Sequence, residues 1–255
     1  MIKVSDYPLL VFVITFFVLS LSVPIGAKCL RKLRKWDESK REDFGIILGA
    51  TLTLLALIVG FSFSMAVSRY DQRKDYEEAE ANAIGTEYVR ADLLPAADAA
   101  KVRALLKNYL DQRVLFYATR DGQQILQINT RTAQLQAELW SAVLGPAAAK
   151  PTPMVALAVS GMNDVLNSQG YTQAAWWNRI PDAAWFLMAA IAVCCNVLVG
   201  YGARDYYTER FLLRVLPLVV SISFFLIADI DSPRGGIIHV QPENLLSLVA
   251  SLRVH

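Results

Sequence analysis

Four stretches of this chain are apolar and almost free of charge, and they constrain its fold more than any other feature. Residues 44–68 run for 25 residues without a charged side chain, and residues 183–203 run for 21. At about 1.5 Å of rise per residue, each crosses a hydrocarbon core of about 30 Å as a helix. Residues 7–27 are also long enough. The fourth stretch, residues 215–228, has only 14 residues, so we expect it to be packed among protein rather than surrounded by lipid.

The first of these stretches has a competing interpretation, a cleaved signal peptide. Its amino-terminal flank offers only Lys3, offset by Asp6, and no small-residue cleavage site leads into a soluble chain. We therefore expect residues 7–27 to remain as a membrane span.

Composition agrees with a membrane protein and excludes other classes. The hydrophobic fraction is 55%, the charged fraction 19% and the mean hydropathy +0.35, which is too apolar for a disordered chain. Lys and Arg number 25 against 23 Asp and Glu, and this near-neutral balance argues against nucleic acid as a partner. Three cysteines, two of them adjacent, do not make a disulfide framework.

Residues 69–181 have a different character and predict a helical domain outside the membrane. The second span continues without a strong breaker until Pro95, which predicts one long helix that leaves the membrane. Three amphipathic segments follow, and we expect a loop over residues 145–153, which contain three prolines. The predicted fold is all-α and polytopic: transmembrane helices 1 and 2 in residues 1–68, the helical domain in 69–181, and helices 3 and 4 with a tail in 182–255.

The positions of Lys and Arg predict an orientation. The loops after the first and third spans carry ten of these residues and the opposite flanks carry six. The positive-inside rule therefore places both loops in the cytoplasm and the helical domain outside. The ten are Lys28, Arg31, Lys32, Arg34, Lys35, Lys40, Arg41, Arg204, Arg210 and Arg214, and the six are Lys3, Arg69, Arg73, Lys74, Arg179 and Arg234.

Residues suited to catalysis or metal binding are scarce. The two histidines, His239 and His255, both lie near the carboxyl terminus, and the sequence has neither a phosphate-binding loop nor a nucleophile elbow. Cys194 and Cys195 lie in mid-span, where a thiol packs as a small apolar group. We therefore expect no enzyme, no cofactor and no metal site.

Two acidic groups have alternative interpretations. Glu77, Glu78 and Glu80 are either a cation site or a solvated helix face, and Arg73 and Lys74 beside them favour the solvated face. Asp229 and Asp231 end the fourth span before a Pro-Gly turn. They are either a metal clasp or helix-terminating turn residues, and a hard cation usually needs about six oxygen ligands, which favours the turn.

Small residues form a stripe along the second span at spacings of three and four, which places them on one helical face and predicts close helix packing. The stripe consists of Gly49, Thr53, Ala56, Gly60, Ser64 and Ser68.

Gly85 lies in the middle of the long helix. There a glycine costs about 1 kcal/mol of helix stability relative to Ala, and we expect another helix to approach it closely.

Three segments carry a family resemblance. They are GFSFSMAVSRYDQR from residue 60, EANAIGTEYVRADLLP from residue 80 and SFFLIADIDSPRGG from residue 223. Together they resemble the bacterial membrane proteins grouped as bestrophin-like, and more distantly the bestrophin anion channels. Bestrophins have a Gly-Phe in the second membrane helix followed, nine residues after the Gly, by an Arg and then aromatics. This chain has Gly60, Phe61, Arg69 and Tyr70 at that spacing.

The resemblance implies a homo-oligomer, specifically a pentamer, in which the second membrane helix lines a hydrophobic neck. Carried over by position, the neck residues are Thr53, Leu57 and Phe61, of which Thr53 departs from the apolar residue expected there. The acidic calcium clasp of eukaryotic bestrophins is reduced to Asp229 and Asp231, so calcium gating is not implied.

Two functions follow as hypotheses. The first is a homo-oligomeric ion channel for anions in the bacterial inner membrane, with the lipid bilayer and inorganic ions as partners. The second is a non-conducting membrane scaffold or sensor whose helical domain binds a partner. The second is favoured by the absence of charged residues inside the first three spans. The resemblance implies that the helical domain is cytoplasmic, whereas the Lys and Arg count places it outside. Both orientations of this domain are therefore kept as alternatives.

Overall fold

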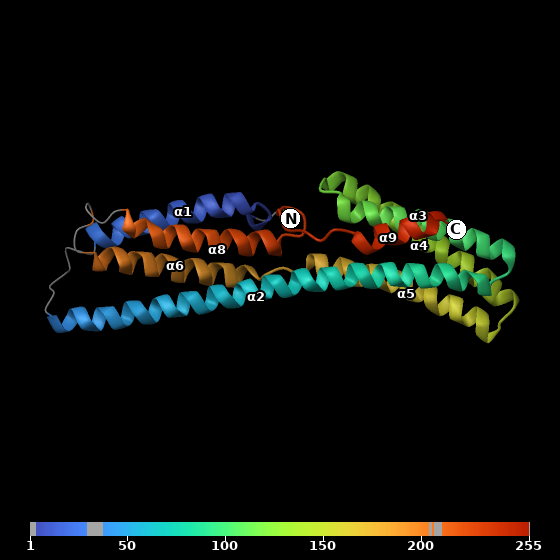
Figure 1. The fold of residues 1–255 in the computed structure, drawn as a ribbon, viewed down its shortest axis with the longest axis horizontal. Helices are drawn as coiled ribbons and strands as arrows, with labels where there is room; N and C mark the ends of the chain where they lie inside the picture. The colour runs from blue at the N-terminus through green and yellow to red at the C-terminus, as the bar shows by residue number, and fades with distance from the viewer. Residues whose placement is uncertain (1–3, 30–37, 204–205, 207–210, 255) are drawn as a thin grey trace. The chain divides into compact units, whose positions relative to one another are not determined.

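The computed structural model describes residues 4–29, 38–203, 206 and 211–254, and within these it is helical with no strand (Figure 1). The all-α, polytopic prediction is confirmed, since four of the helices are long and apolar enough to cross a membrane. Short helical turns are η1 (Val4–Asp6), η2 (Ile25–Cys29), η4 (Ala91–Leu93) and η5 (Leu212–Arg214). The longer helices are α1 (Pro8–Pro24), α2 (Glu38–Arg90), α3 (Ala96–Ala118), α4 (Gly122–Ala149), α5 (Pro153–Trp177), α6 (Asp182–Gly202), α8 (Val215–Asp231) and α9 (Glu243–Val254).

Helix α2 is the long helix that the sequence predicts. It has 53 residues, about 80 Å at 1.5 Å per residue, and contains no proline. It passes into the turn η4, after which Leu94 is extended and Pro95 precedes the first residue of α3. Because the residue before a proline avoids the α conformation, Pro95 sets the end of this helical run.

The chain divides into two compact units. Met1–Tyr70 with Arg179–His239 is called the membrane unit here, and Asp71–Asn178 with Val240–His255 the helical unit. The divisions fall at 70/71 and 178/179, and the sequence prediction places its boundaries at 68/69 and 181/182. Residues 240–255 group with the helical unit, where α9 contacts α3, and the prediction groups them with the last two membrane helices.

In the membrane unit, α1 packs against both α8 and α6. The contact between α1 and α6 is close because glycine permits it: a Cβ at Gly200 would overlap the carbonyl group of Val23. The core contains Leu19 of α1, Met188 of α6 and Phe224 of α8, all at most 2% exposed. In the most apolar stretch of each span, the share of residues buried within the chain is highest for α8, at 44%, and is only 6% for α2. This agrees with the expectation that the short fourth span packs among protein.

In the helical unit, α4 packs between α3 and α5, and its length corrects one expectation. The loop predicted over residues 145–153 is confined to residues 150–152, since α4 continues through Pro146 to Ala149. The residue before Pro146 is Gly145, which lacks the Cβ that would clash with the proline ring. Lys150, which precedes Pro151, has that Cβ, and the helix ends there with φ −145° and ψ 80°.

The orientation predicted from Lys and Arg depends in part on residues outside the described part of the chain. These are Lys3, Arg31, Lys32, Arg34, Lys35, Arg204 and Arg210. The orientation therefore stays a prediction.

Candidate functional site

The membrane segment of α2 has one face turned to its own unit. Leu55, Ser62 and Ala66 are each at most 3% exposed, at spacings of seven and four residues. Leu55 and Ala66 join the core formed with α1, α6 and α8. At about 100° of rotation per residue, the three side chains lie within roughly 40° of one another. This stripe defines the core face of α2.

The predicted neck residues lie on the opposite face. Leu57 and Phe61 are 53% and 62% exposed, and Thr53 is also exposed. Relative to Leu55 they are rotated by roughly 160–240°. The Thr53 hydroxyl donates to the Gly49 carbonyl at 2.9 Å, so its hydrogen is used within the helix and the residue is less polar than its type indicates. Nothing tests their place in a pore, which stays a prediction.

The two flanks of this exposed face differ in size. On one side lie Gly49, Ala56 and Gly60, and within the described chain no atom beyond the helix's own backbone comes within 4 Å of a Cβ at either glycine. On the other side lie Leu54 and Met65, 45% and 39% exposed. Ser64 is exposed between the flanks. The helix-packing role of Gly49, Ala56, Gly60 and Ser64 stays a prediction.

An apolar groove of about 490 Å³ runs beside the small flank, between α2 and α8. Ala56, Gly60 and Phe63 line it from α2, and Val219 and Ser223 are among its residues from α8. The groove exists because Ala56 and Gly60 leave space that larger side chains would fill.

Gly85, in the helical unit, lies against α9. A Cβ there would stand 3.2 Å from Cδ1 of Leu248, tighter than an ordinary van der Waals contact. The absence of a side chain at Gly85 is what allows Leu248 this close, and this approach offsets the poor helix propensity of glycine.

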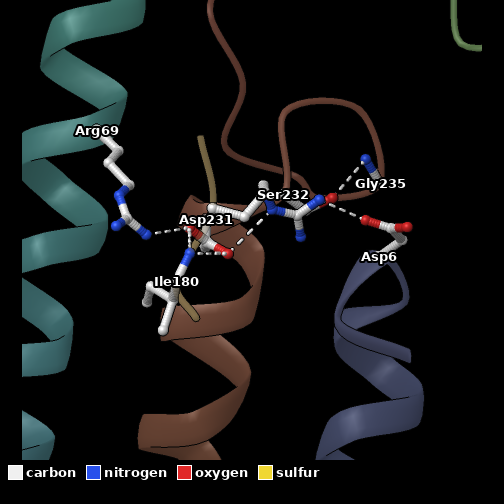
Figure 2. Close-up of polar contacts among 7 residues, drawn as sticks. Asp6, Arg69, Ile180, Asp231, Ser232 and Gly235 are labelled. Carbon is white, nitrogen blue, oxygen red and sulfur yellow. Dashed lines mark hydrogen bonds and ion pairs between the residues drawn. The ribbon is translucent and has the colours of Figure 1, made fainter. Parts of the chain in front are cut away.

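A polar cluster joins the ends of the membrane helices (Figure 2). Asp231, at the end of α8 and fully buried, accepts from the backbone N–H of Ile180 at 3.1 Å and from Nε of Arg179 at 3.0 Å. Nη1 of Arg69, from α2, lies 3.7 Å from the same carboxylate. Nη1 of Arg179 also donates to Asp6 at 2.6 Å. We call Asp6, Arg69, Arg179 and Asp231 the polar junction.

Asp229 serves the turn after α8. Its two carboxylate oxygens accept from the backbone N–H groups of Ile237 and Ile238, each at 2.8 Å. Both acidic residues at the end of the fourth span are thus bonded to protein donors, and no group of three or more metal-ligating side chains occurs among the described residues. The arrangement favours the turn interpretation over the metal clasp. The sequence did not identify Arg179 as the partner of Asp231, or Asp6 as the other partner of Arg179, because these residues lie far apart along the chain.

The interpretation of Glu77 and Glu80 as a solvated face is wrong, although Glu78 is exposed. Glu77 is 1% exposed and accepts from the N–H of Leu245 at 2.9 Å and from Asn244 at 2.6 Å, at the start of α9. Glu80 is fully buried and pairs with Arg113 of α3 at 2.5 Å. Glu77 and Glu80 thus have partners that lie far away along the chain.

The Glu80–Arg113 pair is the centre of a buried network in the helical unit. The hydroxyls of Thr172 and Tyr117 lie 3.2 and 3.4 Å from Oε2 of Glu80. Burial, and then the charge of Glu80, raise the pKa of Tyr117, which stays a neutral donor. Burial alone lowers the pKa of Arg113, but the attraction of Glu80, its hydrogen bond and the neighbouring Tyr109 and Tyr117 together more than offset this, and the pKa is raised. The guanidinium therefore remains charged inside the unit.

Comparison with known proteins assigns the fold. A bestrophin-like domain matches residues 14–245. A bacterial bestrophin homologue from Klebsiella pneumoniae is similar in structure, with a TM-score of 0.63 and 13% identity over 93% of this chain and 98% of that one. A point variant of the same protein gives a TM-score of 0.63 and 13% identity, over 97% and 98%. A search of curated proteins finds no match.

Proposed function

This chain belongs to the bestrophin-like family, and we propose that it forms a homo-oligomeric ion channel whose neck is lined by α2. Anions are the ions that the resemblance to bestrophins implies. The observation that carries the proposal is the exposed face of α2: this span is only 6% buried within the chain, and Leu57 and Phe61 lie opposite its core face.

An exposed apolar face alone does not distinguish a pore from a lipid-facing surface, but the unequal flanks support assembly. A small-residue flank beside a groove on one copy accepts the large flank of the next, with Leu54 and Met65 facing Ala56 and Gly60. Such a head-to-tail contact uses two different surfaces, and it closes into a ring when the rotation between copies divides a full turn. In that ring the face between the flanks points toward the axis.

The chemistry of that face suits a gate. A narrow ring of Leu57 and Phe61 side chains resists hydration, and a pore lined in this way closes by losing its water. The Thr53 hydroxyl is bonded to its own helix, which keeps this position compatible with a mostly apolar constriction.

The assembly is tested with Gly60→Leu, which fills the small flank. Gly170→Leu is the matched control, since Gly170 is also an exposed helical glycine with open space around it, but in the helical unit. We expect symmetric particles for the wild type, measured by light scattering and electron microscopy in detergent, and a smaller species for Gly60→Leu only. Particles without a central axis of α2 helices would refute the channel and favour the scaffold or sensor.

Conduction is tested by ion flux from liposomes. We expect Leu57→Ala with Phe61→Ala to widen the neck and increase flux at least several-fold. Leu9→Ala with Phe17→Ala is the control, because these residues of α1 are the same types and are 72% and 62% exposed. The reversal potential under a salt gradient identifies anions or cations as the permeant ions. No flux from either the wild type or the widened variant would refute the proposal.

A further inference from the structure

Glu87 is a buried carboxyl group in the helical unit. It lies on α2 and is 0% exposed, and neither of its side-chain oxygens has a hydrogen-bond partner among the described residues. An ionised carboxylate in this state is much less stable than a neutral carboxyl, because a buried charge needs a partner to offset its lost hydration. We propose that Glu87 is a proton-controlled joint: its neutral form holds α5 against α2, and its ionised form releases α5. This inference is independent of the channel function.

The joint is the contact between Glu87 and the backbone of α5 at Gly161. A Cβ at Gly161 would overlap Oε2 of Glu87, so the carboxyl occupies the space that a side chain at this position would fill. Fully buried apolar residues lie at most four positions from these two along the chain: Ile84 on α2, Ala91 in η4, and Ala158 and Met162 on α5. The carboxyl is thus held in an apolar contact between two helices.

Two charged groups act on the Glu87 carboxyl, and they oppose each other. Arg90, on the same helix, favours the ionised form, and Asp164, on α5, favours the neutral form. Nη1 of Arg90 lies 3.9 Å from the Asp164 carboxylate, so this arginine is shared with a competing acid. Asp92 of η4 and Arg103 of α3 pair with each other. The charges around the joint therefore do not supply Glu87 with a bonded cation.

Burial has the largest influence, and it raises the pKa of Glu87 from 4.5 to about 8. The carboxyl is therefore protonated in the closed contact at neutral pH. When α5 moves away, the carboxyl meets water and its pKa returns to the ordinary value. Between the two pKa values the closed form binds more protons than the open form, so its stability falls as the pH rises from about 4.5 to about 8. Alkaline pH thus releases the joint.

The size of the effect follows from the same two pKa values. The equilibrium constant for opening increases about fiftyfold between about pH 6 and about pH 8. Opening exposes the apolar side chains of Ala158 and Met162, which are fully buried in the closed contact. The helical unit therefore presents this apolar surface of α5 mainly at alkaline pH.

The test is hydrogen exchange of residues 153–165 of α5 in the full-length protein, corrected for the pH dependence of the exchange chemistry itself. Glu87→Gln keeps the shape of the neutral carboxyl and does not ionise. Glu138→Gln is the matched control, because Glu138 is an exposed glutamate of the same unit, 3.3 Å from Arg131. Asp164→Asn removes the acidic neighbour, whose side chain is 62% exposed.

For the wild type and Glu138→Gln we expect opening to increase about fiftyfold between about pH 6 and about pH 8, and for Glu87→Gln by less than about threefold. For Asp164→Asn we expect the midpoint to move to lower pH, since a negative charge is removed and Arg90 is left to Glu87.

A wild type whose opening does not depend on pH would overturn the proposal. The wild-type pH dependence in Glu87→Gln would overturn it as well, because another group would then be responsible. If Glu87→Gln does not fold, Asp164→Asn decides: a midpoint that stays in place or moves to higher pH contradicts the joint.

Discussion

The buried pair of Glu80 and Arg113 gives the sharpest test of the helical unit. Both side chains are fully buried, and the guanidinium also lies 4.4 Å over the ring of Phe116. Arg113→Met leaves a buried carboxylate whose remaining contacts are the hydroxyls of Thr172 and Tyr117. Glu80→Leu leaves a buried guanidinium without its carboxylate. Neither single variant gives the remaining charge a new partner.

The expected cost follows from the burial. Removing one partner of a buried ion pair costs about 3–5 kcal/mol, whereas replacing both by apolar residues of similar size is often nearly neutral. We therefore expect each single variant to lower the free energy of opening by about 3–5 kcal/mol, and the double variant to lose far less than their sum. Because a tenfold change corresponds to about 1.36 kcal/mol, exchange of the α3 amides should accelerate roughly 150- to 5,000-fold in the single variants.

The assay is hydrogen exchange of α3 in the intact protein, in one detergent at one pH. Arg131→Met is the control, since Arg131 pairs with Glu138 at the surface with both side chains nearly half exposed, and such pairs are worth about 0–1 kcal/mol. Exchange in Arg113→Met that stays within tenfold of the wild type would refute the reasoning. A double variant less stable than both single variants would refute it as well.

Two further outcomes are expected. Gly200→Ala, whose Cβ would overlap the Val23 carbonyl, should cost about 1–3 kcal/mol and lower the thermal midpoint; Gly45→Ala, in open space within the chain, should leave it unchanged or raise it. Equal midpoints would contradict the backbone contact. Asn244→Ala loses its bond to Glu77, worth about 1.5–3 kcal/mol, and should speed exchange in α9. Unchanged exchange would show that this bond does not hold the helix.

The polar face of α2 shows where sequence reasoning was incomplete. Arg73, Glu77, Glu80 and Ile84 continue, at spacings of four, three and four, a stripe of buried positions along one face of the helix. Their register was therefore visible in the sequence. Charge beside opposite charge suggested a solvated surface, because local pairing on a helix is common. Glu80 is bonded to Arg113 of α3 and Glu77 to the start of α9, and only folding brings these residues together.

By itself, the sequence determined the membrane class, the spans and the long second helix, because the lengths of uncharged runs and the place of Pro95 act locally along the chain. The tertiary structure decided which charges are buried and paired. It also decided that the carboxyl-terminal tail joins the helical unit and that Leu57 and Phe61 of α2 are left more than half exposed by the described part of the chain. The physical reason is that burying a charge is tolerated only beside an opposite charge or a donor, and the residues that supply one, such as Asp231 for Arg179 or Arg113 for Glu80, are separated by 52 and 33 positions.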